Sequence, residues 1–544
     1  MNMKPPLSRR GFLGATAGVG AGLALTGCGD FKPKPARLAN ADAQLPTYIQ
    51  YKGVPTSMPA TKDGVSAGYT HFPHEPAKAF PDGPPARGAA INIMNLIFNP
   101  VPPPVGRNAM WQALNTYVGC DLNFEITPVN DYPQKFAVVL AGGDLPDAML
   151  MLPPDQNSAA TPDMLDMLFE DLTPHLSGNN IRDYPYLANI PTDSWRPCVR
   201  NGGIYAIPMP RPVSGGPIFT RLDLFKKKGL DPNPKTWREF VQLCKDITDP
   251  KVHQYALGDP VTTWNLVMQM QGAPNWWRAE KGRFTHYYET EECKQALDAV
   301  HQLKKAGVLH PDAFAVKGKF KDWFGNGQIA MNPDAPAAWN DYYTTYGPIS
   351  KGLDVGYMLP PAWDDSTRGG QWQGRANYAT LIIRKAPKAR IKQILRALNA
   401  LAAPFGTDGY LLRKYGVRGP DHTVKGPDPI LTPKGTAETY LPTNFATDAP
   451  FTLYYPQKPD IVPTQYAFQE EAVKRLIPNP AEALYSATDA KLSKLFNTQL
   501  DSLRYGIMDG RNRMAEWDAA MRDWRKRAGD KMRAEYEQAW EIRH

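Results

Sequence analysis

Residues 201–240 read NGGIYAIPMPRPVSGGPIFTRLDLFKKKGLDPNPKTWREF, and this stretch decides the fold class. Its apolar run at 204–209 is predicted to be a strand, because Pro208 and Pro210 exclude a helix there. A second apolar strand is expected at residues 217–220. Two short strands separated by glycine and proline are typical of a chain that leaves one compact unit and enters another.

Two helices are predicted to follow these strands. The first covers residues 222–228 and ends at Gly229, which accepts the left-handed backbone angles of a helix end. Thr236 is the expected N-cap of the second, with Glu239 three residues later as the reciprocal partner of a capping box. The alternation of strands and helices predicts an α/β fold. The stretch at 201–240 fits either the first strand of a second lobe or a loop inside a single α/β domain.

The length and composition of the chain favour two lobes. A chain of 544 residues is longer than one hydrophobic core usually organises, and 42% hydrophobic residues suffice for two cores. The formal net charge is +8, and the loss of three basic residues in an N-terminal segment that we expect to be removed leaves +5. Because no dense run of Lys and Arg occurs, no nucleic acid partner is expected.

The N-terminus has the pattern of an export signal. SRRGFL at residues 8–13 precedes a short apolar run at 15–25, which is too short to span a bilayer permanently. SRRGFL resembles a twin-arginine signal, and LTGC, which ends at Cys28, resembles a lipobox. The resemblance implies cleavage before Cys28 and a lipid, with fatty acids such as palmitate, on its sulfur. An ordinary signal peptide with a chance cysteine is the alternative.

Four separated stretches resemble one known family. They are DYPQKFAVVLAGGDLPDAMLML at 131–152, GGIYAIP to PKTWREF at 202–240, FGNGQIAM at 324–331 and FGTDGYLLRKYGVRG at 405–419. In this order they resemble the extracellular solute-binding proteins of ABC importers, and in particular the large oligosaccharide-binding lipoproteins related distantly to maltose-binding protein. The resemblance extends over roughly residues 89–544.

The resemblance implies a two-lobed α/β fold of the type II periplasmic-binding-protein class. A hinge of two or three crossover strands and a helical C-terminal extension are expected. The predicted division is a signal peptide at 1–27, a lipidated cysteine and proline-rich tether at 28–88, a first lobe at 89–209 plus 360–404, and a second lobe at 210–359 plus 405–544. The tether is expected to be an extended spacer between the membrane and the lobes.

The family function implies that aromatic rings line the cleft between the lobes. The C–H faces of a pyranose are apolar, so a flat indole can cover them while polar groups bind the hydroxyls. The candidates in Gly- and Pro-rich loops are Trp276, Trp277, Trp339, Trp363 and Trp372, with Tyr466 as a further stacking ring. Because Trp is also a common core residue, a core position remains the alternative for each.

Charged residues add further ligand-binding candidates. Asp144 and Asp147 lie in a Gly-Asp-x-Pro-Asp turn and are placed to bind sugar hydroxyls, although such aspartates often cap turns instead. Arg211 and Arg375 lie near the predicted crossings, where a guanidinium can hold a carboxylate. Uronate-containing sugars are therefore admissible ligands, with ordinary surface arginines as the alternative.

No metal and no cofactor are predicted. DSWRPCVRNGG at 193–203 lacks the alternating oxygen ligands of a calcium loop, and Pro73 prevents His71 and His74 from sharing a helix face. The remaining cysteines are Cys120, Cys198, Cys244 and Cys293. They lack CxxC spacing, so buried thiols are expected and disulfides stay open.

The predicted function is therefore that of a monomeric, lipid-anchored binding protein on the outer face of the cytoplasmic membrane. Exported by the twin-arginine route, it would capture an oligosaccharide and deliver it to the transmembrane subunits of an ABC permease. A secreted carbohydrate-active enzyme, a glycosidase or a lyase, is the alternative, and a surface adhesin is a third class. No GxSxG, HExxH or GxxxxGK[ST] motif supports an enzyme.

Overall fold

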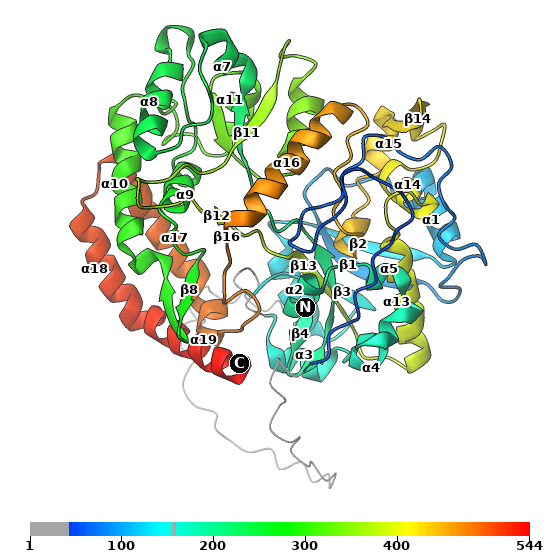
Figure 1. The fold of residues 1–544 in the computed structure, drawn as a ribbon. Helices are drawn as coiled ribbons and strands as arrows, with labels where there is room; N and C mark the ends of the chain where they lie inside the picture. The colour runs from blue at the N-terminus through cyan, green and yellow to red at the C-terminus, as the bar shows by residue number, and fades with distance from the viewer. Residues whose placement is uncertain (1–42, 155, 157–158, 544) are drawn as a thin grey trace, which may run out of the picture. The chain divides into compact units, whose positions relative to one another are not determined.

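The structure of the protein is a computed structural model that describes residues 43–154, 156 and 159–543. The predicted signal peptide, residues 1–27, and Cys28 lie outside the described residues. Two separate groups of buried residues form around two sheets, and we call them the first and the second lobe (Figure 1).

The first lobe contains a five-stranded sheet in the order β2-β1-β3-β13-β6. Its strands are β1 (Ile91–Ile97), β2 (Leu122–Pro128), β3 (Ala148–Met151), β6 (Ala206–Pro210) and β13 (Asn377–Ile383). β1 is parallel to β2 and β3, whereas β13 is antiparallel to both β3 and β6. A strand from the far part of the sequence is thus inserted between strands of the N-terminal part, so the first lobe is built from two separated segments.

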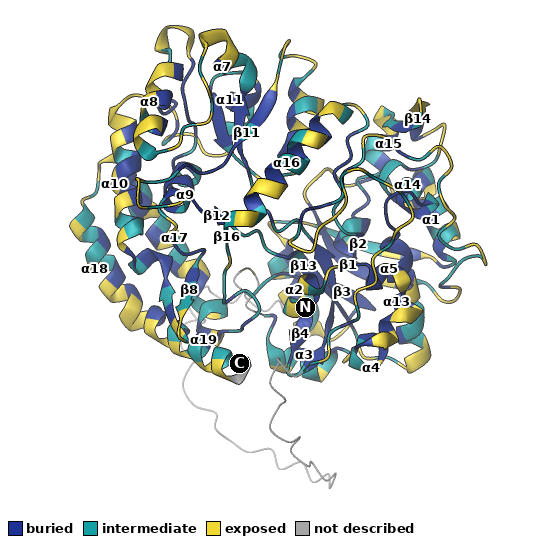
Figure 2. Cartoon of the chain, viewed as in Figure 1, coloured by how far each residue is buried: buried dark blue, intermediate teal, exposed yellow. Residues whose placement is uncertain are grey.

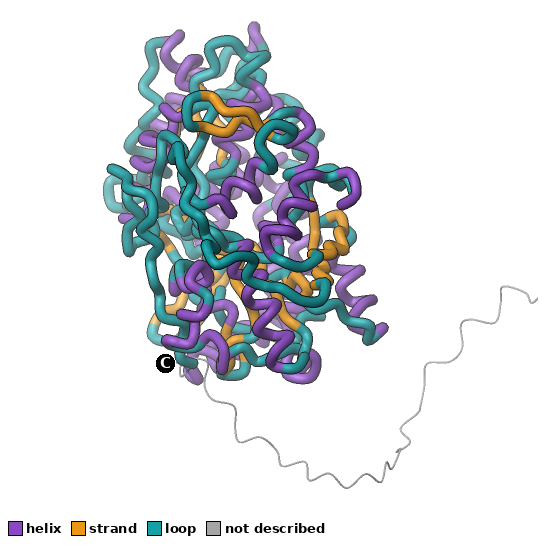
Figure 3. Tube along the Cα trace, turned by 90° about the vertical axis from the view of Figure 1, so that its right-hand side faces the viewer, coloured by secondary structure: helices purple, strands orange, loops and turns teal. Residues whose placement is uncertain are grey.

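Helices and short strands surround this sheet. The helices are α1 (Ala109–Val118), α2 (Tyr132–Gly142), α3 (Pro162–Leu168), α4 (Thr173–Leu176), α5 (Pro185–Ala188), α6 (Thr192–Trp195), α13 (Lys388–Leu401), α14 (Asp408–Tyr415) and α15 (Pro433–Glu438). The short strands are β4 (Val199–Arg200), β5 (Gly203–Ile204), β14 (His422–Lys425) and β15 (Asp428–Leu431). Figure 3 shows long loops running between these and the other elements.

The second lobe has a three-stranded antiparallel sheet, β10-β7-β11, and most of the long helices. Its strands are β7 (Ile218–Arg221), β8 (Trp277–Glu280), β9 (Arg283–His286), β10 (Met331–Pro333), β11 (Val355–Met358), β12 (Gln371–Trp372) and β16 (Leu476–Ile477). Its helices are α7 (Leu222–Lys228), α8 (Trp237–Ile247), α9 (Pro260–Met270), α10 (Glu291–Lys305), α11 (Phe320–Gly325), α12 (Ala338–Asp341), α16 (Val462–Ala472), α17 (Ala487–Asp509), α18 (Met514–Trp524) and α19 (Asp530–Arg543). Figure 2 shows the outer faces of α18 and α19 largely exposed.

The stretch at residues 201–240 folds largely as its sequence predicts. α7 ends at Gly229, which has a φ of 67°, and the side chain of Thr236 accepts a hydrogen bond from the Glu239 N–H as the N-cap of α8. The Glu239 carboxylate, however, accepts its bond from the Lys235 N–H at 2.8 Å and not from the N-cap residue. The helix start is therefore confirmed, with the reciprocal bond shifted by one residue.

Between residues 89 and 543, three chain segments cross from one lobe to the other. Met209 belongs to the first core and Ile218 to the second, so residues 210–217 form the first crossing. Trp372 packs on the second core and Ala379 lies in the first, so residues 373–378 form the second crossing. Residues 447–452 form the third, between Ala446 of the first core and Leu453, which packs with α16. Several independent connections favour hinge motion over free rotation of the lobes.

The boundary predicted between the lobes after residue 404 is displaced. Residues 405–446, expected in the second lobe, pack on the first: α14 and α15 both contact α1, and Leu441 and Phe445 lie in the first core. The second lobe resumes at α16. The reason is an apolar surface on α1 and α13 that these short helices cover, a tertiary contact without a local sequence signal.

The predicted tether is also corrected for residues 43–88, which we call the strap. Phe72 is 3% exposed, and it packs with Phe405 and Tyr454. The backbone of Ala77 exchanges hydrogen bonds with Gly406 and Asp408, both near 2.9 Å. Prolines keep this segment extended, but its aromatic side chains gain more from burial than from water, so the strap lies on the lobes.

Candidate functional site

Two adjoining pockets lie where the chain crosses between the lobes. The inter-lobe pocket has a volume of about 110 Å³ and lies between the end of β3 and the helices α17 and α19. The hinge pocket has a volume of about 310 Å³ and lies between α9 and the second crossing. Trp276, Arg375, Asn479 and Glu482 line both pockets. We therefore treat the two pockets as one candidate site.

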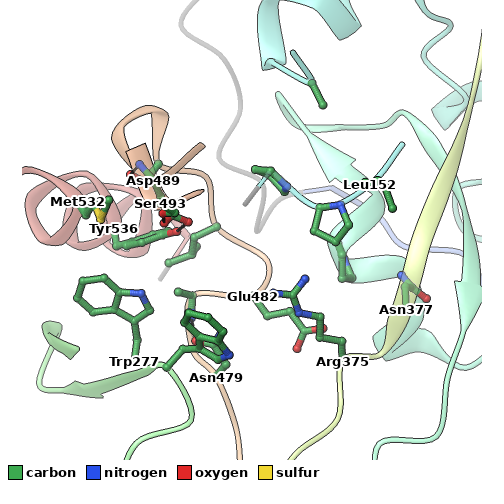
Figure 4. Close-up of a pocket in the computed structure, with 18 of the residues that line it drawn as sticks. Leu152, Trp277, Arg375, Asn377, Asn479, Glu482, Asp489, Ser493, Met532 and Tyr536 are labelled. Carbon is green, nitrogen blue, oxygen red and sulfur yellow. Dashed lines mark hydrogen bonds between the residues drawn. The ribbon is translucent and has the colours of Figure 1, made fainter. Parts of the chain in front are cut away.

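Figure 4 shows how the two lobes contribute to the inter-lobe pocket. Leu152, which directly follows β3, and Asn377 of β13 come from the first lobe, and Trp277 and Tyr536 face them from the second lobe. Arg375, at the second crossing, lies between the two sides. A ligand in this pocket would touch both lobes, which is the geometry that allows a ligand to favour one lobe arrangement over another.

Trp276 occupies a backbone conformation that non-glycine residues seldom adopt. Its φ is 64°, in the left-handed region. The carbonyl of Trp276 accepts a 2.8 Å bond from the Tyr287 N–H, and its ring lies 5.2 Å from the Tyr287 ring. Strained backbone of this kind persists where the surroundings hold it and is frequent at ligand sites. The strain directs an indole that lines both pockets.

A second tryptophan, Trp372, forms part of the hinge pocket. Its backbone N–H donates to Gln269 Oε1 at 2.7 Å, and its indole Nε1–H donates to the Ala273 carbonyl at 3.0 Å. The Asn275 amide donates to the Gln373 and Ile477 carbonyls at 2.9 and 3.1 Å. Because the bond to Ala273 already uses the indole N–H of Trp372, the part of this side chain left for a ligand is the face of its ring.

The charged residues that line the hinge pocket are Asp334, Arg375 and Glu482. Burial raises the pKa of Glu482 above its ordinary value, while the Ala376 N–H, which donates to it at 3.0 Å, and Arg375 counteract this. Burial likewise raises the pKa of Asp334, against the effect of Lys321. Carboxylates and a guanidinium at one pocket provide acceptors and donors for sugar hydroxyls.

The inter-lobe pocket is closed on one side by packed aromatic rings. The rings of Trp277 and His286 lie 4.7 Å apart, and Tyr536 lies 5.3 Å from Trp277. Burial, together with Arg533, lowers the pKa of His286 well below its ordinary value. His286 is therefore a neutral member of an apolar wall at neutral pH, and its Nδ1 accepts a 3.3 Å bond from the Tyr288 N–H.

The structure brings together four of the predicted ligand-binding residues. Trp276 and Arg375 line both pockets, Trp277 lines the inter-lobe pocket, and Trp372 lines the hinge pocket. Their contact with a ligand stays a prediction. Sequence reasoning missed Gln269, Asn275, Asn479 and Glu482. Thr262, Asn265 and Gln269 repeat at helical spacing on α9 and all line the hinge pocket, a polar stripe that could have identified this face.

Two of the predicted cleft tryptophans lie elsewhere. Trp339 is 1% exposed, its ring lies 5.1 Å from Phe219, and its Nε1–H donates to the Val355 carbonyl at 3.2 Å. Trp363 stacks on Trp237 at 5.0 Å and lines neither pocket. Both rings bury apolar surface inside the second lobe, which a Gly- and Pro-rich neighbourhood in sequence did not reveal.

The remaining candidates have structural partners. Asp147 is 5% exposed and accepts bonds from the Asn92 N–H at 2.9 Å and from Arg390 Nη2 at 2.7 Å. The Tyr466 hydroxyl donates to the carbonyl of Pro59, in the strap, at 2.9 Å. Neither residue lines the two pockets. Arg211 does not line them either; its guanidinium lies 5.5 Å from the centre of the Tyr378 ring.

Other site types find little support among the described residues. No group of three or more His, Cys, Asp or Glu side chains within residues 43–543 is placed to hold a metal ion. Cys120, Cys198, Cys244 and Cys293 are buried free thiols. The part of the chain that the structure describes contains no helix whose length and apolarity would let it cross a membrane.

Comparison with known proteins identifies relatives over most of the chain. The family model of the bacterial extracellular solute-binding proteins matches residues 105–404, more than half of the 544 residues. The polygalacturonan/rhamnogalacturonan-binding protein YtcQ of Bacillus subtilis (strain 168) is 23% identical over 83% of this chain and 91% of its own. Lipoprotein LipO of the same organism is 23% identical over 81% of this chain and 90% of its own.

Solved structures share the fold. The alginate-binding protein AlgQ2, crystallised without calcium, superposes with a TM-score of 0.62 at 16% identity, covering 84% of this chain and 98% of its own. FusA of S. pneumoniae, in complex with kestose, gives a TM-score of 0.59 at 15% identity, covering 83% and 99%. The predicted type II periplasmic-binding-protein fold and the predicted family are thus confirmed: the chain belongs to the bacterial extracellular solute-binding proteins.

Proposed function

We propose that this protein captures an oligosaccharide between its lobes and delivers it unchanged to the permease of an ABC importer. The observation that carries the proposal is the candidate site at the crossings, where Trp276 and Trp372 lie beside amide and charged side chains. The ring faces suit the apolar faces of pyranoses, and groups such as Gln269, Arg375 and Glu482 suit their hydroxyls. An apolar site with a few placed polar groups is the usual construction of a small-molecule site.

Closure of the lobes would couple binding to transport. The inter-lobe pocket has walls from both lobes, so a bound sugar gains contacts from both only when they approach. Three crossings restrict the motion to a hinge. The permease would then recognise the liganded arrangement because it presents both lobe surfaces together.

The relatives support a plant or bacterial polysaccharide fragment as the ligand. One is named for binding polygalacturonan and rhamnogalacturonan, and another for binding alginate. Fragments of such polymers have several rings and therefore need several contacts. The two adjoining pockets, with Trp276 shared between them, provide contacts for more than one ring.

The anchor is part of the proposal. A lipid that carries palmitate on Cys28, after export by the twin-arginine route, would hold a monomer at the outer face of the cytoplasmic membrane. Support comes from the LTGC pattern and from a relative that is named as a lipoprotein. Labelling of cells with radioactive palmitate, compared between the natural chain and Cys28→Ala, tests this step independently of sugar binding.

The enzyme alternative receives no support from the comparisons, because the family consists of solute-binding proteins and YtcQ is named for binding a polysaccharide. Within the site, Glu482 accepts a backbone bond from Ala376. This contact is that of a residue held by the fold, and it assigns Glu482 no role as an acid or a base.

A thermal-shift screen with a product assay tests the proposed function. The purified chain is heated with neutral and uronic oligosaccharides, and the same mixtures are assayed for new reducing ends. We expect one class of sugar to raise Tm progressively with its concentration. The stabilisation of the folded state should be about 2.7 kcal/mol at one hundred times Kd, and the sugar should be recovered intact. Release of reducing ends at catalytic rates, or no shift with any sugar, would contradict the proposal.

A further inference from the structure

Aromatic side chains gather at the carboxyl end of the first-lobe sheet, next to the inter-lobe pocket, which Tyr378 also lines. Phe98 follows β1 directly, and its ring lies 5.9 Å from both Tyr378 and Phe445. Phe98 is 59% exposed, which is rare for a ring of this size. In open α/β sheets, ligands bind outside the carboxyl ends of the parallel strands. An exposed aromatic at this edge is therefore a surface that a sugar face can cover.

A group of charges adjoins these rings. Arg211 follows β6, and its guanidinium lies over Tyr378 at 5.5 Å from the ring centre. Thr447, in the third crossing, donates through Oγ1 to the Pro208 carbonyl at 3.3 Å, which places the neighbouring Asp448 beside the end of the same strand. All three crossings thus contribute to one place in the first lobe.

This group contains more positive than negative charge. Asp448 is contacted by Arg413 Nη1 at 2.6 Å and by Lys414 Nζ at 2.8 Å. Together with Arg211, three cations accompany one carboxylate, which leaves a net charge of +2 for these four residues. We call them the hinge cation group. Among the described residues, Nε and Nη2 of the buried Arg413 have no hydrogen-bond partner.

The excess of positive charge in this group affects the pKa of Lys414, which is partly exposed. Burial lowers the pKa of Lys414, and Arg211 and Arg413 lower it further while Asp448 raises it. The Lys414 side chain is 35% exposed, so it can meet a ligand, whereas Arg413 at 1% cannot. Asp448 compensates only part of the repulsion among the three cations. An anion near Lys414 and Arg211 would offset the part that remains.

We propose that Phe98 and Tyr378, with Arg211 and Lys414 of the hinge cation group, form a first-lobe subsite for an anionic sugar, a hexuronate. The ring face of the sugar would cover Phe98, and its carboxylate would lie near the two cations. This inference rests on the proposed function and adds the charge of the ligand to it. It also places a ligand ring on the first lobe, beside the inter-lobe pocket, whose wall includes Tyr378.

Matched acidic and neutral ligands test the subsite. Isothermal titration calorimetry on the full mature chain compares tri- to hexasaccharides of galacturonate and of mannuronate with their methyl esters, which keep the rings and lose the charge. We expect one acid to bind at least tenfold more tightly than its ester, and the preference to weaken in 0.5 M NaCl. Lys414→Met and Arg211→Met should each reduce the preference at least threefold.

Control variants separate the charge from the ring. Lys425→Met removes an exposed lysine on β14 and should leave both affinities unchanged. Phe98→Ala should weaken acid and ester alike, by about tenfold, without unfolding the protein because Phe98 is mostly exposed. Circular dichroism checks the fold of each variant.

The outcomes distinguish the two proposals. If acids and esters bind equally, or only neutral sugars bind, the anionic subsite is wrong and the proposed function stands. If the acid preference survives both cation substitutions, the assigned residues are wrong. If no sugar of any kind binds the folded chain, the proposed function fails and the subsite with it.

Discussion

The backbone N–H of Ser66 donates a 2.7 Å hydrogen bond to Oε1 of Gln469, across 403 residues of sequence. Ser66 belongs to the strap, and Gln469 belongs to helix α16 of the second lobe. The strap also bonds to the first lobe, since the Tyr51 N–H donates to Asn189 Oδ1 at 2.8 Å. A segment that would have been a free spacer therefore braces both lobes beside the crossings.

Gln469→Ala should destabilise the protein through the strap. The substitution leaves the buried Ser66 N–H without its acceptor, which costs about 1–3 kcal/mol. Urea unfolding measures the loss as a lower midpoint at an unchanged slope. Gln242→Ala is the control, because its amide bonds to Asp246 at the exposed surface of α8 at 2.7 Å. Equal midpoints for the two variants would show that the strap contact contributes nothing.

Trp276 allows strain and binding to be separated. Trp276→Gly and Trp276→Ala should both weaken sugar binding at least tenfold, because both remove the indole. The glycine variant should be more stable than the alanine variant by about 1 kcal/mol, because a φ of 64° suits glycine and strains alanine. Calorimetric titration and thermal unfolding give the two quantities.

Trp363→Ala is the matched control for this comparison. Its ring stacks on Trp237 and lines neither pocket, so stability should fall while affinity stays within twofold. Loss of affinity in Trp363→Ala as large as in Trp276→Ala would contradict the assignment of the site.

Asp147→Asn should damage stability and leave ligand affinity intact. Asp147 is buried, and it is ion-paired with Arg390 at 2.7 Å and bonded to the Asn92 N–H at 2.9 Å. Breaking a buried pair costs about 3 kcal/mol. The neighbouring Asp144→Asn, at an exposed position, should change stability by less than about 0.5 kcal/mol. A tenfold affinity loss in Asp147→Asn at full stability would restore its role as a sugar contact.

His286 should make the protein less stable in mild acid. Its pKa in the folded state is lowered by burial, so below its ordinary pKa of about 6.5 the unfolded chain binds a proton that the folded chain does not. Stability should then fall as pH decreases below about 6.5, with a slope that approaches about 1.4 kcal/mol per pH unit for one proton. Denaturant unfolding between pH 5 and 8 measures the slope.

His286→Gln should remove part of this slope, and the exposed His74→Gln should not. Some slope should remain in the His286 variant, because burial also lowers the pKa of His175 and His310. An unchanged slope in His286→Gln would show that this histidine is protonated in the folded protein as readily as in the unfolded chain.

Local signals in the sequence determined the helix and strand types around residues 201–240. The cap at Thr236 and the end at Gly229 depend on neighbouring residues, so they could be predicted without a fold. The family could be recognised for a related reason, because the order of such local patterns along the chain is visible in the sequence itself. Trp276, Trp277, Trp372 and Arg375 were also candidates from the sequence, and they line the two pockets, while their contact with a ligand stays a prediction.

Only the tertiary structure decided where long-range contacts fall. Trp339 and Trp363 have the same sequence surroundings as the pocket tryptophans, yet one is enclosed beside Phe219 and the other stacks on Trp237. The strap and residues 405–446 lie elsewhere than the sequence predicted for the same reason. Both pack on apolar surfaces that distant segments create when they fold. Burial depends on which surfaces meet in space, and a single sequence records residue types but not those meetings.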